Sequence, residues 1–106
     1  MEYTTLVECA DKCEIALSGD KAITHFLLVN GIITDEIFDS VNDPKSMLTS
    51  RDKSRILVND IKKMVCLNPQ NYHKLIRYFR ENKLQYVDIL AIFDEKFTSM
   101  RERHRQ

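Results

Sequence analysis

The fold is decided by residues 49–84, which read TSRDKSRILVNDIKKMVCLNPQNYHKLIRYFRENKL. The first half of this stretch places apolar residues at i, i+4, i+7 and i+8, and the second half at i, i+3, i+4 and i+7. Both spacings are typical of one face of an α-helix. The two rows are Leu57, Ile61, Met64 and Val65, followed by Tyr72, Leu75, Ile76 and Phe79. Two amphipathic helices joined by a short turn form an antiparallel pair, and their apolar faces need further helices to cover them.

The starts of these two helices are marked by residues that favour helix termini. Ser50 can cap the first helix, because its hydroxyl can accept a hydrogen bond from a backbone N–H of the first turn. Asn68 can cap the second helix, with Pro69 at the first helical position, where a missing N–H costs little. We therefore expect one helix on each side of the Asn68-Pro69 turn.

Two helices are predicted before this stretch by apolar residues at helical spacing. The first runs from about residue 4 to 17 and stops at residues 18–20, Ser-Gly-Asp, where Ser or Asp can cap the next segment. The second runs from about residue 21 to 29. It ends at residues 30–31, Asn-Gly, because glycine adopts the left-handed conformation without steric cost.

Two more helices complete the pattern. Thr34 caps a helix whose first turn carries acidic residues, and residues 42–44, Asn-Asp-Pro, end it. The last helix begins after residues 82–83 and has a broad apolar face. We expect the core to span about residues 4–98 and the polar tail, residues 99–106, to be frayed.

The composition agrees with a single all-α domain. A chain of 106 residues can bury one core, and its 43% hydrophobic and 30% charged content is typical of globular proteins. Two glycines and two prolines supply few of the tight turns that a many-stranded β fold requires. The expected architecture is therefore a bundle of six antiparallel helices.

Nothing in the pattern indicates a membrane segment or an export signal. No apolar run approaches bilayer length, and the acidic N-terminus lacks the basic-then-apolar order of a signal peptide. We expect a cytoplasmic protein in which Cys9, Cys13 and Cys66 are reduced thiols.

Charge is distributed unevenly along the chain. Residues 1–43 contain two basic and nine acidic residues, a net charge of −7, whereas residues 44–106 contain fourteen basic and seven acidic residues, a net charge of +7. A molecule with oppositely charged halves can attract copies of itself or similarly built relatives. The alternative is that the helices simply carry charged, solvated outer faces.

The sequence predicts one acidic and one basic surface. The acidic surface lies on the helix that follows Thr34 and consists of Asp35, Glu36, Asp39 and Asp43. The basic surface lies on the helix that follows Ser50. Arg51, Arg55 and Lys62 share one face of it, Lys63 lies alongside, and Lys53 lies to one side. A patch for a charged partner and plain solubility with helix-dipole complementation are both open interpretations.

Catalysis and metal binding are not expected. Cys9 and Cys13, with His25 in the next helix, have neither the spacing nor the four clear ligands of a zinc site, and Cys13 falls in an apolar row. No Gly-rich phosphate loop and no strained nucleophile turn is present, and the acidic cluster lacks the order of a calcium loop. We therefore predict no enzyme activity and no cofactor.

A small helical nucleic-acid-binding domain is the alternative function. Lys74, Arg77 and Arg80 add positive charge to the second helix of the pair, and Gln70, Asn71 and His73 at its start could read bases in a helix–turn–helix arrangement. Against this, the total charge is zero, and the acidic half would repel phosphate.

Four passages within residues 17–97 form a pattern that is known from one protein family. Residues 27–36 read LLVNGIITDE, with leucines, a small turn, a hydrophobic residue before Thr, and acidic residues. Residues 51–57, RDKSRIL, are a basic, polar entry into a helix, residues 72–79 are centred on aromatic side chains, and residues 87–91 are short and apolar. This pattern resembles a caspase recruitment domain (CARD), a branch of the death-fold superfamily, in which these passages correspond to the connection between helices two and three, the start of helix four, helix five and helix six.

This resemblance implies a six-helix antiparallel bundle with Greek-key death-fold topology and no catalysis. It also implies binding to other CARD-containing proteins, such as a caspase, an adaptor or a scaffold, in apoptotic or inflammatory signalling. In such pairings a basic surface from helices one and four commonly meets an acidic surface from helices two and three. The hypothesis is that the basic surface of one molecule faces the acidic surface of its neighbour, and that repetition builds a helical string.

Overall fold

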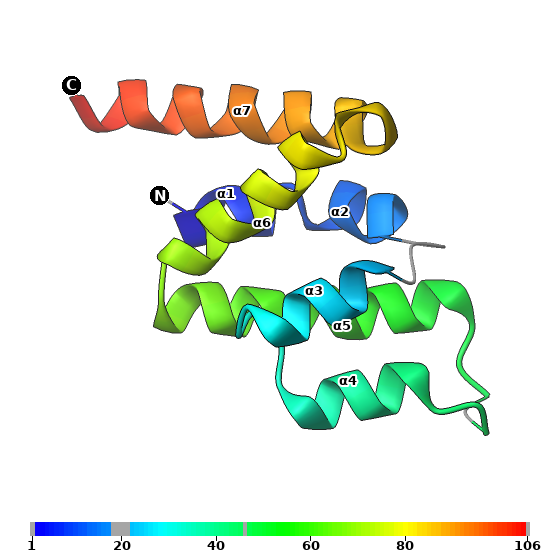
Figure 1. The fold of residues 1–106 in the computed structure, drawn as a ribbon. Helices are drawn as coiled ribbons and strands as arrows, with labels where there is room; N and C mark the ends of the chain where they lie inside the picture. The colour runs from blue at the N-terminus through cyan, green and yellow to red at the C-terminus, as the bar shows by residue number, and fades with distance from the viewer. Residues whose placement is uncertain (1, 18–21, 46, 106) are drawn as a thin grey trace.

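The structure is a computed structural model that describes residues 2–17, 22–45 and 47–105 (Figure 1). Within these ranges it contains seven helical segments and no strand, so the all-α prediction is confirmed. The segments are α1 (Glu2–Glu8), α2 (Ala10–Leu17), α3 (Ala22–Val29), α4 (Asp35–Asn42), α5 (Ser50–Leu67), α6 (Gln70–Glu81) and α7 (Lys83–Arg105). The predicted stop at residues 18–20 and the predicted first residue of the second helix, Lys21, lie outside the described residues.

The first predicted helix is divided. We expected a single helix over about 4–17, but a turn at Cys9 separates α1 from α2, and α1 begins earlier, at Glu2. The Cys9 amide is shared between the carbonyls of Thr5, at 3.1 Å, and Leu6, at 3.2 Å. Both short helices pack against α5 and α7, so the division lets each piece bury its own apolar residues.

The turns around α4 follow the predicted chemistry. After α3, the Ile32 amide donates to the Leu27 carbonyl and the Gly31 amide to the Leu28 carbonyl, which is the Schellman pattern with glycine at φ 71°. Thr34 caps α4 as expected, and its hydroxyl accepts from the Ile37 amide at 3.4 Å. These contacts fix where α4 begins.

The cap of α5 is Thr49, and the prediction of Ser50 was wrong. The Asp52 amide donates to the Thr49 hydroxyl at 3.1 Å, and the Thr49 amide donates to the Asp52 carboxylate at 3.2 Å. This reciprocal capping box satisfies two amides, whereas Ser50 is already the first helical residue. At the next turn we expected Asn68 to be the N-cap of α6 and Pro69 its first residue, but Pro69 is the N-cap, with φ −58° and ψ −21°, and α6 begins at Gln70. The side-chain oxygen of Asn68 still accepts a hydrogen bond from the Gln70 amide at 3.1 Å.

Helix α7 extends further than expected. It has non-helical dihedrals at Tyr86 (φ −117°, ψ 21°) and then continues through Arg105, so the backbone of the tail is helical where we expected fraying. Met100 is buried, and the Thr5 hydroxyl donates to its sulfur at 3.2 Å. This contact with α1 anchors α7 beyond residue 98.

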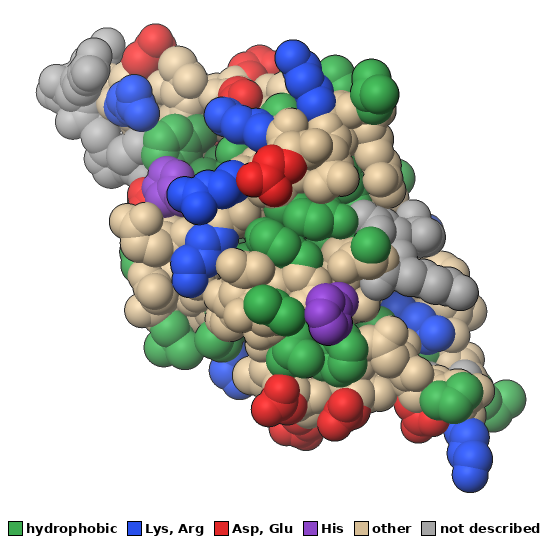
Figure 2. All heavy atoms as spheres, viewed as in Figure 1, with side chains coloured by type: hydrophobic (Ala, Val, Ile, Leu, Met, Phe, Trp, Pro, Cys, Tyr) green, Lys and Arg blue, Asp and Glu red, His purple; other side chains and the backbone are tan. Residues whose placement is uncertain are grey.

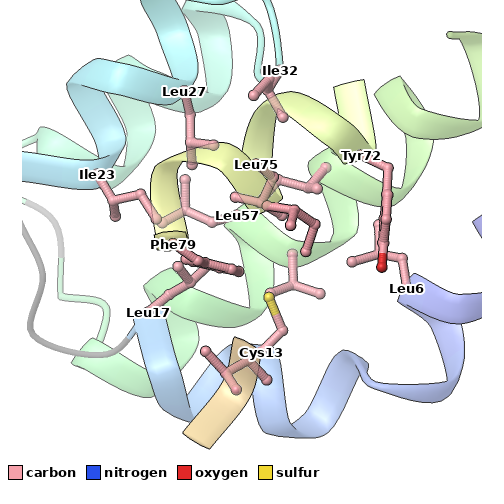
Figure 3. Close-up of a cluster of buried hydrophobic side chains, with 14 of the residues drawn as sticks. Leu6, Cys13, Leu17, Ile23, Leu27, Ile32, Leu57, Tyr72, Leu75 and Phe79 are labelled. Carbon is pink, nitrogen blue, oxygen red and sulfur yellow. The ribbon is translucent and has the colours of Figure 1, made fainter. Parts of the chain in front are cut away.

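Helix α5 occupies the centre of the arrangement. It packs against α1, α2, α4 and α6, whereas α7 lies along one edge of the molecule and α4 along the opposite edge (Figure 1). Side chains from α1, α2, α3, α5 and α6 converge on one apolar cluster (Figure 3). The cluster includes Leu6, Cys13, Leu17, Ile23, Leu27, Leu57, Leu75 and Phe79. Removing these side chains from water is the main force that holds the helices together. None of the helices in the described part of the chain combines the length and the apolar character that a bilayer crossing requires.

Candidate functional site

The acidic surface lies on the outer side of α4. Asp35, Glu36 and Asp39 are exposed on the helix, and Asp43 is exposed at its C-terminal cap. The opposite side of α4 packs inward and keeps Val41 buried. In the view of Figure 2, acidic side chains gather over α4 along the lower edge of the molecule. Sequence spacing therefore placed this set correctly on one exposed helix.

A buried carboxylate that sequence reasoning missed holds the start of α4. Asp60 on α5 is only 7% exposed, and it accepts hydrogen bonds from the Thr34 amide at 2.9 Å and from the Thr34 hydroxyl at 3.4 Å. The N-terminus of a helix favours a nearby negative charge, so Asp60 also complements the dipole of α4. The available signal was an acidic residue three positions after Leu57, inside the apolar row of α5.

The basic surface is narrower than the sequence suggested. Arg51, Arg55 and Lys63 are exposed on α5, and the four-residue interval places Arg51 and Arg55 next to each other on the helix surface. Lys62 is half-buried, and its positive charge lowers the pKa of the Cys13 thiol against the larger, opposite effect of burial. Lys53 is also half-buried, so Arg51, Arg55 and Lys63 present most of the accessible charge.

Lys53 and Asp43 both line a cavity between α2, α3, α4 and α5. The cavity has a volume of about 260 Å³, and its lining includes Leu17, Thr24, Val41, Asp43, Lys53 and Leu57. The Asp43 carboxylate also accepts a hydrogen bond from the Lys45 amide at 2.9 Å, which stabilises the turn after α4. Asp43 therefore contributes to local structure as well as to the acidic surface.

Among the residues that the structure describes, no ion pair within the molecule neutralises either surface. Across the described ranges the ion pairs are Arg80 with Asp94 at 2.8 Å and Lys96 with Glu8 at 4.0 Å. Both pairs lie outside the acidic and basic surfaces, which leaves those charges available to a partner. Exposed ion pairs stabilise a monomer little, so this charge separation has no large folding role.

A second basic row runs along α6, as the pattern opposite its apolar stripe predicted. It consists of His73, Lys74, Arg77 and Arg80, of which Lys74 is half-buried and the others are exposed. Asn71, however, is buried and donates to the Met64 carbonyl at 2.9 Å. It therefore closes the end of α5 and is not positioned to read a base, which argues against the helix–turn–helix hypothesis.

The thiols of α2 and the preceding turn belong to the core. Burial raises the pKa of Cys9, and burial together with the neighbouring Cys9 raises the pKa of Cys13 to about 12. Both thiols are therefore protonated, and weakly nucleophilic, near neutral pH. The His25 ring contacts the edge of Phe38 at a centroid distance of 6.5 Å. In the part of the chain that the structure describes, no three His, Cys, Asp or Glu side chains group as a metal site.

Comparison with known proteins assigns no role to these surfaces. No family model, no curated protein and no solved structure matches the chain. Function is therefore inferred from the charge and geometry of the described residues and from the sequence resemblance.

Proposed function

We propose that the protein is a non-catalytic, CARD-like interaction module that binds similar modules through opposite charges. The observation that carries the proposal is the pair of exposed surfaces: acidic on α4, and basic on α5. The all-helical fold and the resemblance of residues 17–97 to the CARD family support it. The expected partners are other CARD-containing proteins, including a caspase, an adaptor or a scaffold, in apoptotic or inflammatory signalling.

The proposed contact joins different surfaces of two molecules. Arg51, Arg55 and Lys63 of one molecule approach the acidic surface of the next, and the free ends can add further copies. Each exposed ion pair contributes about 0–1 kcal/mol, so several pairs and complementary shape must act together. Such a heterologous contact builds a string and not a closed dimer.

The proposal includes a six-helix death fold and a cytoplasmic location. In this interpretation α1 and α2 together correspond to one divided helix, and α3 to α7 supply the other five. The free thiols of Cys9, Cys13 and Cys66 are what a reducing compartment maintains.

The test uses two complementary charge reversals. One variant carries Asp35→Lys and Asp39→Lys on α4, and the other carries Arg51→Glu and Arg55→Glu on α5. Each variant alone should fail to form strings in light scattering at low ionic strength. An equimolar mixture should regain strings in which the two variants alternate, because the unaltered basic and acidic surfaces still attract each other and the two reversed surfaces are also complementary.

A matched control separates specific contact from net charge. Asp88→Lys with Glu95→Lys on α7 changes the charge by the same amount at exposed positions outside both surfaces. This control should form strings like the unaltered protein, and circular dichroism should show equal helical content in all variants. Strings that survive both reversals, or mixtures that fail to regain strings, would refute the charge-surface mechanism.

A further inference from the structure

A third surface, between the acidic helix and the basic row of α6, is formed by α3. The Phe26 ring of α3 contacts the Tyr78 ring of α6 at a centroid distance of 4.5 Å, and the His25 ring of α3 contacts Phe38 of α4 at 6.5 Å. Lys74 of α6 also donates to the Asn30 carbonyl directly after α3, at 3.3 Å. Helix α3 therefore lies between α4 and α6 on one face of the molecule.

The outer side of α3 carries no charged residue. Its sequence is AITHFLLV; Ala22, His25 and Val29 are exposed, and Phe26 is half-buried. The exposed fraction of Val29 is 69%. We call Ala22, Phe26 and Val29 the apolar strip. Exposed apolar surface bordered by polar residues is typical of protein interfaces.

The charges on the two sides of the strip are opposite. Figure 2 shows acidic side chains over α4 along the lower edge, basic side chains with acidic ones among them in the upper half, and hydrophobic side chains between the two regions. On the basic side Arg80 is paired with Asp94, but Arg77 is exposed and belongs to neither ion pair that the described residues make. On the acidic side Asp39 is likewise exposed and outside both pairs.

We propose that a second copy of this chain binds this face and forms a closed, two-fold symmetric dimer. A two-fold axis that lies in the interface and runs along the apolar strip, parallel to α3, places the acidic surface of each copy against the basic row of the other. The strip then meets its own copy at the centre, where Val29 loses its contact with water. Because the face is self-complementary, every charge contact occurs twice.

The area of this face determines the affinity that we expect for the dimer. Helices of 8, 8 and 12 residues that lie about 10 Å apart cover a projected area of roughly 400 Å². Stable interfaces bury about 800 Å² on each partner, so this dimer belongs to the weak class, with dissociation in the micromolar range. Association should also weaken as salt concentration rises, because exposed charges are screened.

This dimer does not depend on the CARD resemblance, but it uses the same acidic surface as the proposed string. The basic row of α6 and the basic surface of α5 therefore compete for α4. A closed dimer buries the acidic surface of α4 on both copies and would therefore prevent the addition of further molecules to a string. String formation would then require the dimer to dissociate first.

Sedimentation velocity of the full chain over a concentration series tests the inference. Arg77→Glu and Asp39→Lys should each weaken the dimer by at least about tenfold, since each reversal acts at two symmetric sites. The double variant Asp39→Lys with Arg77→Glu should regain the dimer, because the reversed charges complement each other across the axis. Arg55→Glu on α5 should leave the dimer unchanged.

The apolar strip is tested with a matched pair of lysine substitutions. Val29→Lys should abolish the dimer, whereas Ile15→Lys on α2 should not, although both residues are 69% exposed. A protein that remains monomeric at high micromolar concentration refutes the dimer, as does a dimer that tolerates Val29→Lys. A dimer that Arg55→Glu abolishes and that Arg77→Glu leaves intact also refutes the proposed face. So does a dimer that is lost in Asp39→Lys and is not restored in the double variant.

Discussion

Replacing Asp60 with alanine should destabilise the protein and loosen the helix that carries the acidic surface. The carboxylate is buried on α5 and accepts two hydrogen bonds from Thr34, the cap of α4, at 2.9 and 3.4 Å. Hydrogen bonds to charged groups contribute about 1.5–3 kcal/mol. Thr34 itself is exposed, so water can replace part of what is lost. We therefore expect Asp60→Ala to lower the free energy of unfolding by about 2 kcal/mol.

This cost is large enough to measure in two ways. For a chain of this length, about 2 kcal/mol lowers the melting temperature by roughly 9 °C, and urea unfolding gives the free energy directly. Asp60→Asn keeps the shape and one acceptor oxygen, so it should cost about 1 kcal/mol. The neighbouring Asn59 is exposed on the same helix, and Asn59→Ala should change stability by less than about 0.5 kcal/mol.

The same variant links stability to association. At a temperature where Asp60→Ala remains folded, its strings or dimers should be weaker than those of the unaltered protein, because the start of α4 is no longer fixed. An Asp60→Ala variant that loses less than about 0.5 kcal/mol, or that costs no more than Asn59→Ala, would show that the Thr34 contacts do not hold α4.

Four other outcomes follow from the turns, the core and the charges. Gly31→Ala should lower the free energy of unfolding in urea by about 1 kcal/mol, because residue 31 has a φ of 71°, which an L side chain rarely adopts. The cost comes from the backbone alone, since the added methyl group meets no atom within 4 Å. An unchanged urea midpoint would contradict this. The raised pKa of Cys13, about 12, means that the unfolded thiol ionises first. The contribution of Cys13 to the free energy of unfolding is therefore complete below about pH 9 and is lost between about pH 9 and 12. Over this pH range the free energy of unfolding should fall less steeply for Cys13→Ala than for the unaltered protein. Thiol titration near neutral pH should label the exposed Cys66 rapidly and Cys13 only after unfolding. Labelled duplex DNA should not bind at physiological salt in fluorescence anisotropy, because Asn71 is buried and Arg80 of the basic row is paired with Asp94. Tight binding with a steep salt slope would support the nucleic-acid alternative.

Local patterns in the sequence identified most of the helices. Apolar periodicity located α3 to α6, and turn residues such as Gly31 and Thr34 gave their ends because these positions have local conformational causes. The capping box of α5 was not predicted, although Thr49 and Asp52 have the required spacing. Thr49 and Ser50 are adjacent, and each has a hydroxyl that can cap a helix, so the local sequence was consistent with either residue as the N-cap.

Features that depend on distant contacts could not be read from the chain. The turn at Cys9 depends on how α1 and α2 each meet α5 and α7, and the extension of α7 depends on the contact between Thr5 and Met100. Exposure along α5 was predicted for Arg51 and Arg55, but periodicity could not show that Lys62 is half-buried. Charge type and helix face are local properties, whereas the accessible part of a surface is decided by neighbouring helices.

The central position of α5 has a consequence for the order in which the molecule opens. Helix α5 touches helices on several sides, whereas α4 packs mainly on α3 and α5 at one edge of the structure. Regions with few neighbours open at lower free energy than the centre, and they do so without global unfolding. Amide deuterium uptake should therefore be faster in α4 than in the middle of α5. The acidic helix α4 would then open locally more often than α5. A partner that binds α4 would reduce this opening, while the hydrogen bonds of α5 remain formed throughout.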